Sequence, residues 1–183
     1  MASETFVSAM MLITGVVAAS ILIVAVLPMI WGMVGTFSSA SAATDRSMRT
    51  DFKIVTTYAK ITSGSGYLTC SNVSVWIKNI GTTRISANDL KLSDVVVGKS
   101  DSFYRATLST NTPPWPAARA TSSNYQTWYY YIYDVGTINN IWEPGETLQI
   151  DTFAKDATTS GTAVYFQFTL PSGVSRSAEF TTS

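Results

Sequence analysis

The stretch that decides the fold is residues 6–35, FVSAMMLITGVVAASILIVAVLPMIWGMVG. It contains no charged side chain, and its only small polar side chains are Ser8, Thr14 and Ser20. As an α-helix it would be about 45 Å long, whereas the hydrocarbon core of a bilayer is about 30 Å thick. The sequence therefore predicts a helix that spans a membrane or packs in the core of a filament.

A cleaved signal peptide is the alternative interpretation of this stretch. Signal peptides carry a basic segment before an apolar core of about 7 to 15 residues. Here no Lys or Arg precedes the apolar run, and the run is at least twice that length. Although Ala40-Ser41-Ala42 is similar to a cleavage motif, the pattern favours a retained anchor.

The helical pattern continues beyond the apolar stretch. Phe37, Thr44 and Met48 follow helical spacing, which extends the helix to about Arg49 as a stalk. We expect three parts: a transmembrane or filament-core helix over residues 1–35, a helical stalk over 36–50, and an extracytoplasmic β domain over 51–183.

Small residues on the helix predict close helix–helix packing. Gly15 and Ala19 form a small-xxx-small pair, with Ala18 and Ala25 nearby, and such pairs let two helices approach closely. Glu4 is open to two interpretations. It is either a solvated acid at the membrane surface or, as in pilin-like filaments, a partner for the terminal amine of a neighbouring subunit inside an apolar core.

From residue 51 the hydrophobic period changes to two, which is typical of β-strands. Val73, Val75 and Ile77 alternate with polar or larger side chains, and turn signals such as Glu143-Pro144-Gly145 separate the runs. The pattern predicts eight strands, at residues 51–59, 73–80, 89–97, 102–108, 127–135, 147–153, 162–170 and 174–181. We expect an all-β immunoglobulin-like antiparallel β-sandwich.

Composition argues against catalysis and nucleic-acid binding. The chain has no His, one Cys, and twelve basic against twelve acidic residues, so the commonest general base and the thiolate metal cluster are missing. Without a basic excess there is no visible source of affinity for nucleic acid. We expect no enzyme activity, no cofactor and no metal site.

Aromatic residues mark the candidate contact surfaces. The run at residues 125–133 alternates, placing Trp128 on one face of a strand and Tyr129, Tyr131 and Tyr133 on the other. These four residues, together with Trp115 in a proline-rich segment, are candidate interface anchors, since Tyr and Trp are enriched in them. A packed core position is the alternative for each. Asn72-Val73-Ser74 is a candidate glycosylation sequon at Asn72.

Several segments, taken in order, resemble one family. They are the apolar amino terminus opening Met-Ala-Ser-Glu, Met48-Arg49-Thr50-Asp51-Phe52-Lys53-Ile54, Val75-Trp76-Ile77-Lys78-Asn79-Ile80-Gly81-Thr82, Trp142-Glu143-Pro144-Gly145-Glu146, and Phe166-Gln167-Phe168-Thr169-Leu170-Pro171-Ser172-Gly173. Together they are similar to the FlaF/FlaG family of archaeal flagellum (archaellum) accessory proteins. The stretch at residues 99–141 is expanded relative to a compact member of that family.

The resemblance implies a single-pass protein of the archaeal cell membrane whose β domain lies in the pseudoperiplasm. Family members are stator components of the archaellum motor that form homo-oligomers or filaments. With a FlaF-like partner they tie the motor to the S-layer. Archaellins and type IV pilins share much of this layout. A cell-surface filament subunit whose helix packs in the fibre core is therefore the alternative.

Overall fold

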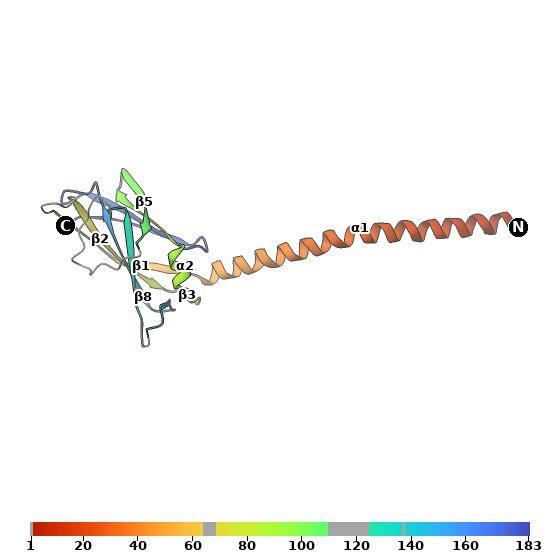
Figure 1. Ribbon diagram of the computed structural model, residues 1–183, viewed down its shortest axis with the longest axis horizontal. Coiled ribbons are helices and arrows are strands. Elements are labelled where there is room, and N and C mark those ends of the chain that lie inside the picture. Colours follow the sequence, from red (N-terminus) through yellow and green to blue (C-terminus); the bar gives the residue numbers. More distant parts are fainter. Residues whose placement is uncertain (1, 64–68, 110–124, 137) are drawn as a thin grey trace. The chain divides into compact units, whose positions relative to one another are not determined.

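The computed structural model describes residues 2–63, 69–109, 125–136 and 138–183. The chain divides into an amino-terminal unit ending at Asp45 and a carboxyl-terminal unit beginning at Arg46. The elements of Figure 1 are, in chain order, α1 (Ala2–Arg49), β1 (Phe52–Thr62), β2 (Cys70–Asn79), β3 (Ile85–Ser86), α2 (Ala87–Lys91), β4 (Asp94–Lys99), β5 (Ser102–Leu108), β6 (Thr127–Tyr133), β7 (Ile141–Trp142), β8 (Thr147–Ala154), β9 (Ala163–Thr169) and β10 (Ser175–Thr181). The predicted class, a long apolar helix followed by a β domain, is confirmed.

Helix α1 is one uninterrupted helix of 48 residues. It continues through Pro28, which cannot donate a backbone hydrogen bond to the carbonyl of Val24. Its hydroxyl groups turn back on the helix: Thr14 donates to the Met10 carbonyl at 2.8 Å, and Ser20 donates to the Val16 carbonyl at 2.8 Å. These hydroxyls therefore need no outside partner in an apolar medium.

The β domain is built on an eight-stranded sheet in the order β1-β2-β8-β6-β5-β4-β9-β10. Neighbouring strands are antiparallel except β5 and β6, which run parallel and pair through only two residues each. The sheet folds over at this short joint into two layers, β1-β2-β8-β6 and β5-β4-β9-β10. This is the predicted sandwich, with a parallel joint that the sequence did not predict.

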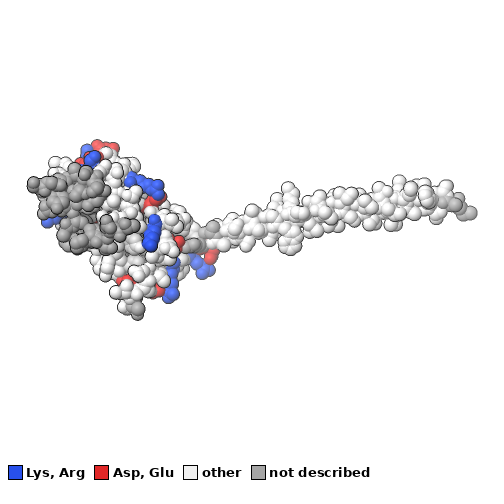
Figure 2. Space-filling view, viewed as in Figure 1, with Lys and Arg blue, Asp and Glu red and all other residues white. Residues whose placement is uncertain are grey.

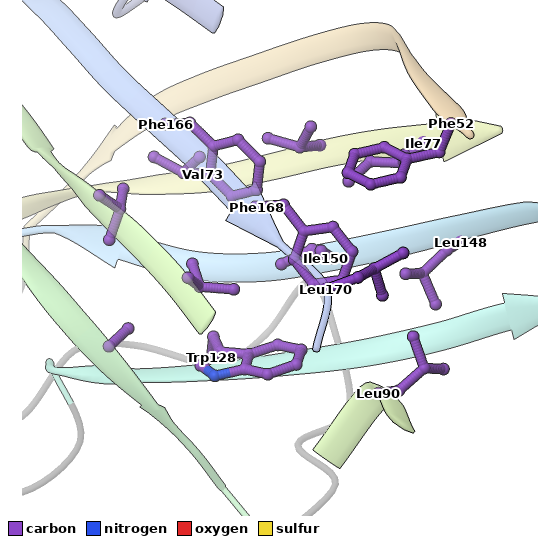
Figure 3. Packing of buried hydrophobic residues seen from close by; sticks show 14 of the residues in the cluster. Phe52, Val73, Ile77, Leu90, Trp128, Leu148, Ile150, Phe166, Phe168 and Leu170 are labelled. Carbon is purple, nitrogen blue, oxygen red and sulfur yellow. The ribbon is translucent and has the colours of Figure 1, made fainter. Parts of the chain in front are cut away.

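The core lies between these two layers. The ring of Phe168 on β9 contacts Phe52 of β1 edge-on, with 5.4 Å between centroids, and Trp128 of β6 at 6.2 Å. Figure 3 shows these rings among buried aliphatic side chains of both layers. The alternation of Val164, Phe166 and Phe168 with polar neighbours produces this arrangement, since successive strand residues point to opposite faces.

One predicted strand is partly wrong. Residues 89–91 belong to α2, and the strand β4 begins at Asp94. The physical reason is a capping box: the backbone N–H of Asp89 donates to the Ser86 hydroxyl at 3.2 Å, and the Ser86 backbone N–H donates to the Asp89 carboxylate at 3.4 Å. The turn of helix that follows buries Leu90 against the core.

The short strands β3 and β7 form a separate two-stranded sheet and were not predicted. Two-residue strands carry too little periodicity to be recognised in a sequence. They hold Trp142 in the core, where its indole N–H donates to the Glu146 carbonyl at 3.0 Å.

Candidate anchoring helix and contact surface

The surface of α1 is apolar along nearly all its length. Every side chain described between residues 3 and 42 is exposed, and no charge occurs from Thr5 to Thr44. In Figure 2 almost the whole helix is white, and the charged side chains gather over the rest of the chain. Among the described residues, α1 is the one helix long and apolar enough to cross a membrane.

The predicted packing residues Gly15, Ala18, Ala19 and Ala25 all lie in this exposed part of α1, and so does Glu4. An added methyl group at Gly15 would meet nothing within 4 Å, so the space above this residue is open to a neighbouring helix. Their role in helix association stays a prediction.

The carboxyl-terminal end of α1 is tied to the β domain by backbone hydrogen bonds. The N–H of Thr82 donates to the Arg49 carbonyl at 2.9 Å, and the N–H of Gly81 donates to the Asp51 carbonyl at 2.8 Å. A Cβ atom at Gly81 would lie 2.5 Å from both the Arg49 oxygen and the Asp51 nitrogen. Only glycine fits here without a shift, because the two backbones are in direct contact.

Side chains extend this junction into the sandwich. The Arg176 guanidinium at the start of β10 donates to the Asp51 carboxylate at 2.6 Å and lies over the Phe52 ring. The amide of Asn79 donates to the carbonyls of Thr83 and Trp142 and accepts from the N–H of Gly81. A force applied to the end of α1 therefore reaches strands of both layers.

The buried carboxylate of Glu146 organises the same end of the domain. It accepts the backbone N–H groups of Val135 at 2.8 Å and Glu143 at 2.9 Å, and the side chain is 4% exposed. Among the described residues no group of three or more His, Cys, Asp or Glu side chains could hold a metal ion. Glu146 acts in the fold as a structural acceptor.

The predicted tyrosine row lies on the outward side of the layer β1-β2-β8-β6. Tyr131 is 58% and Tyr133 is 46% exposed, and their rings pack edge-on with 4.9 Å between centroids. Tyr129 is half-buried against Phe153 and Cys70.

The register extends this row across the whole layer. Tyr131 pairs with Gln149, which pairs with Trp76, and Tyr129 pairs with Asp151, which pairs with Ser74 beside Tyr58. We call this surface the tyrosine face, and it consists of Tyr58, Trp76, Tyr129, Tyr131 and Tyr133 with Lys53, Lys60 and Lys78 at its margins.

Polar side chains fill the middle of the tyrosine face. The Tyr133 hydroxyl donates to the Gln149 side-chain oxygen at 2.6 Å, and the Gln149 amide donates to both oxygens of Asp151 at 2.9 Å. Burial raises the pKa of Asp151, although the hydrogen bond from Gln149 acts in the opposite direction. This network holds Tyr133 in a defined orientation.

Two other aromatic candidates have different outcomes. Trp128 is 1% exposed and packs against Phe168, so its expected place at an interface is wrong and the core alternative is right. It lies on the inward face of β6, since its side chain alternates with those of Tyr129 and Tyr131. Trp115 lies outside the described residues.

The expected glycosylation site is not supported by the fold. Asn72 is 7% exposed and Ser74 is 1% exposed. Both lie on β2, which pairs with β1 on one side and β8 on the other. The side chain of Asn72 is therefore closed off from solvent in the folded domain, and glycosylation at this residue stays a prediction.

Sequence reasoning missed two of the five aromatic residues of the tyrosine face. Tyr58 and Trp76 were not recognised because a register shift between Ile54 and Thr56 interrupts the alternation of β1, and because the order of the strands is not readable from the chain. The signal that could have found them is the alternation of Tyr58 and Lys60 with the buried Ala59.

The comparison with protein families matches most of this chain to one family. The sequence model of the archaeal-type flagellin family matches residues 2–180. An uncharacterized protein of Archaeoglobus fulgidus is 27% identical over 150 residues, which cover 82% of this chain and 80% of that protein.

Two solved structures show partial similarity to this chain. The archaellum periplasmic stator protein FlaG from Sulfolobus acidocaldarius is 22% identical, with a TM-score of 0.46 over 72% of this chain and 99% of that one. The complex of FlaF and FlaG from the same organism gives 19% identity and a TM-score of 0.46, covering 70% and 87%.

The family match includes both α1 and the β domain, and it confirms the predicted kinship with archaellum proteins. Since it spans nearly the whole chain, this protein belongs to the archaeal-type flagellin family.

Proposed function

We propose that this protein is a non-enzymatic structural component of the archaellum, a stator subunit anchored in the archaeal cell membrane by α1. The observation that carries the proposal is the uncharged and exposed surface of α1 from Thr5 to Thr44 in a chain of the archaeal-type flagellin family. A stationary part of a rotary machine must hold both membrane and wall. An apolar helix joined to a rigid sandwich supplies one element for each.

The length of α1 supports self-assembly. At 1.5 Å per residue the 48 residues are about 72 Å long, more than twice the thickness of the hydrocarbon core. The apolar residues 6–35 account for about 45 Å of this length, so unless the helix is strongly tilted, part of its apolar surface lies beyond the hydrocarbon core and is available to other copies. Gly15, Ala18, Ala19 and Ala25 permit close approach, and residues 36–50 then act as a stalk.

The resemblance to accessory proteins supports the remaining parts of the proposal. The β domain lies in the pseudoperiplasm, and a FlaF-like protein and the S-layer are its partners. Neither nucleic acid nor a cofactor takes part. The absence of His from the sequence supports a purely structural role.

A filament subunit of the archaellin or pilin type is the second candidate. The observation that favours it is the family match itself, which starts at residue 2 and therefore includes α1. In this case α1 leaves the membrane and packs in a fibre core.

Fractionation of cells distinguishes the two candidates. A stator subunit stays with the membranes after filaments are sheared off, and mass analysis of the membrane-bound protein gives its mature amino terminus. Recovery of most of the protein in sheared extracellular filaments would replace the first candidate with the second.

Substitutions in α1 test self-assembly separately. Gly15→Leu with Ala19→Leu should reduce the assembly of the full-length protein in detergent, measured by sedimentation. Val17→Leu on the opposite side of the helix is the matched control. If the wild type, the double variant and Val17→Leu assemble equally, the small residues of α1 do not take part in self-assembly.

A further inference from the structure

The tyrosine face carries an unusual distribution of charge. Strands β1, β2, β6 and β8 contain Lys53, Lys60 and Lys78, and their one acid, Asp151, is 5% exposed. Within the part of the chain that the structure describes, none of these lysines takes part in an ion pair. Aromatic rings with lysines around them and no exposed carboxylate form a surface complementary to an acidic one.

A matching acidic surface occurs elsewhere on the same domain. Three exposed carboxylates gather around the turn between β4 and β5: Asp101, Asp156, which accepts from the Ser102 hydroxyl at 3.0 Å, and Glu179, which accepts from the Ser100 hydroxyl. Asp101 is paired with Lys99, whereas Asp156 and Glu179 bind serine hydroxyls. We call these three residues the acidic turn.

The two surfaces lie on different parts of the domain. The acidic turn follows the end of β4 at Lys99, whereas the start of β4 pairs with Thr169 near Arg176 and the end of α1. Asp101 and Glu179 belong to the layer β5-β4-β9-β10, whereas the tyrosine face lies on the other layer, and Asp156 follows the end of its strand β8. A contact between two different surfaces is heterologous. An assembly built from it has a free tyrosine face at one end and a free acidic turn at the other, so further copies can bind.

We propose that the tyrosine face of one copy binds the acidic turn of a second copy, and that this contact joins successive β domains in the assembled protein. Tyr131 and Tyr133 supply the apolar anchors, and Lys53, Lys60 and Lys78 face Asp156 and Glu179 of the neighbour. The inference rests on the proposed self-assembly and names the surface through which the β domains take part in it.

The hydrogen-bond network beneath the face prepares it for binding. Gln149 holds the Tyr133 hydroxyl, and Tyr131 packs against the Tyr133 ring, so both rings keep their orientation before contact. Binding then costs less side-chain entropy than ordering two free tyrosines would.

Exchanging the charges of the two surfaces tests the contact. The full-length protein is studied in detergent, and its assembly is measured by sedimentation and electron microscopy. The triple variant Lys53→Glu, Lys60→Glu, Lys78→Glu should raise the concentration needed for assembly by about tenfold or more. The double variant Asp156→Lys, Glu179→Lys should do the same. The protein that combines all five substitutions should regain assembly, because its two surfaces are complementary again.

Controls separate this contact from other causes. Lys91→Glu places the same change on an exposed lysine away from the face and should leave assembly unchanged, whereas Lys78→Glu alone should weaken it. Circular dichroism verifies that each variant is folded. The inference is overturned if the triple variant assembles as well as the wild type. It is also overturned if the triple and double variants are folded but defective in assembly and the protein with all five substitutions does not regain assembly.

The failure of the proposed function has a different signature. If the wild-type protein does not assemble at any concentration, self-assembly itself is wrong. If the wild type assembles, and Gly15→Leu with Ala19→Leu blocks assembly but the charge variants do not, α1 joins the copies and the tyrosine face does not.

Discussion

At the scale of single residues, the end of the β domain nearest α1 depends on one buried carboxylate. Glu146 accepts two backbone N–H groups that have no other acceptor among the described residues. Replacing it with Ala would leave these part-buried donors without their acceptor and would remove a buried side chain, and an unsatisfied buried donor costs about 1 to 3 kcal/mol. We predict that Glu146→Ala lowers the free energy of unfolding by about 2 to 4 kcal/mol, measured by urea denaturation of the full-length protein in detergent.

Glu143 offers the matched control for that measurement. Its side chain forms an ion pair with Arg84 at 3.2 Å, and the Arg84 side chain is 71% exposed. Exposed ion pairs contribute at most about 1 kcal/mol. Glu143→Ala should therefore cost clearly less than Glu146→Ala, and equal losses would show that the buried network does not hold this end together.

Asp151 makes the stability of the domain depend on pH. Because burial raises its pKa in the folded state above 3.8, the folded state binds a proton more tightly than the unfolded state does. The contribution of Asp151 to stability is therefore present below pH 3.8 and is lost as the pH rises through the raised pKa.

Asp151→Asn should remove this dependence. The variant should equal or exceed the wild type in urea midpoint at pH 7, and its midpoint should fall less between pH 4 and pH 7. Asp156→Asn, which removes an exposed carboxylate, is the control for net charge. An unchanged pH profile in Asp151→Asn would mean that a different group dominates the titration.

At the scale of elements, the junction between α1 and β1 is tightly constrained by backbone contacts. Gly81 lies against the backbone of residues 49–51, and a methyl group added to it would lie 2.5 Å from the Arg49 oxygen. We predict that Gly81→Ala displaces this segment and costs about 1 to 3 kcal/mol, as overpacking usually does. Hydrogen exchange at residues 50–52 and 80–82 should become faster.

Gly35→Ala is the control for that change, because nothing lies within 4 Å of the added methyl group on α1. Alanine also has the higher helix propensity. The exchange rates at the junction should be unaffected by it. Equal rates in wild type and Gly81→Ala would show that the junction can relax without cost.

The elements also show what a single sequence can predict. Residues 102–108 were predicted as a strand and form β5 with the same bounds, since their alternation is regular and turn residues flank them. Residues 89–91 were predicted as strand but form helix, because a capping box of two polar side chains outweighs a short apolar pattern. The tyrosine row was recognised on β6, but its extension to Trp76 depends on strand order, which only the folded chain supplies.

At the scale of the whole molecule, the chain combines a helix whose apolar stretch is longer than the hydrocarbon core of a bilayer is thick with a domain whose charges are unevenly distributed. Residues 5–44 carry no charge, whereas residues 45–183 contain all twelve basic and eleven of the twelve acidic residues. We therefore expect the helix to determine the location of the protein in the cell, and the surface of the β domain to determine how neighbouring copies bind.

Glu4 distinguishes the two possible environments of α1. In a membrane anchor this acid lies at the lipid surface and stays hydrated, so Glu4→Gln should leave both insertion and assembly unchanged. In a fibre core the acid would be buried with a neighbouring subunit's terminal amine, and removing one partner of such a buried pair costs about 3 to 5 kcal/mol. For the stator we predict unchanged sedimentation and unchanged resistance to alkaline extraction. Asp45→Asn, at the other end of the uncharged run, is the control, and loss of assembly in Glu4→Gln alone would assign α1 to a filament core.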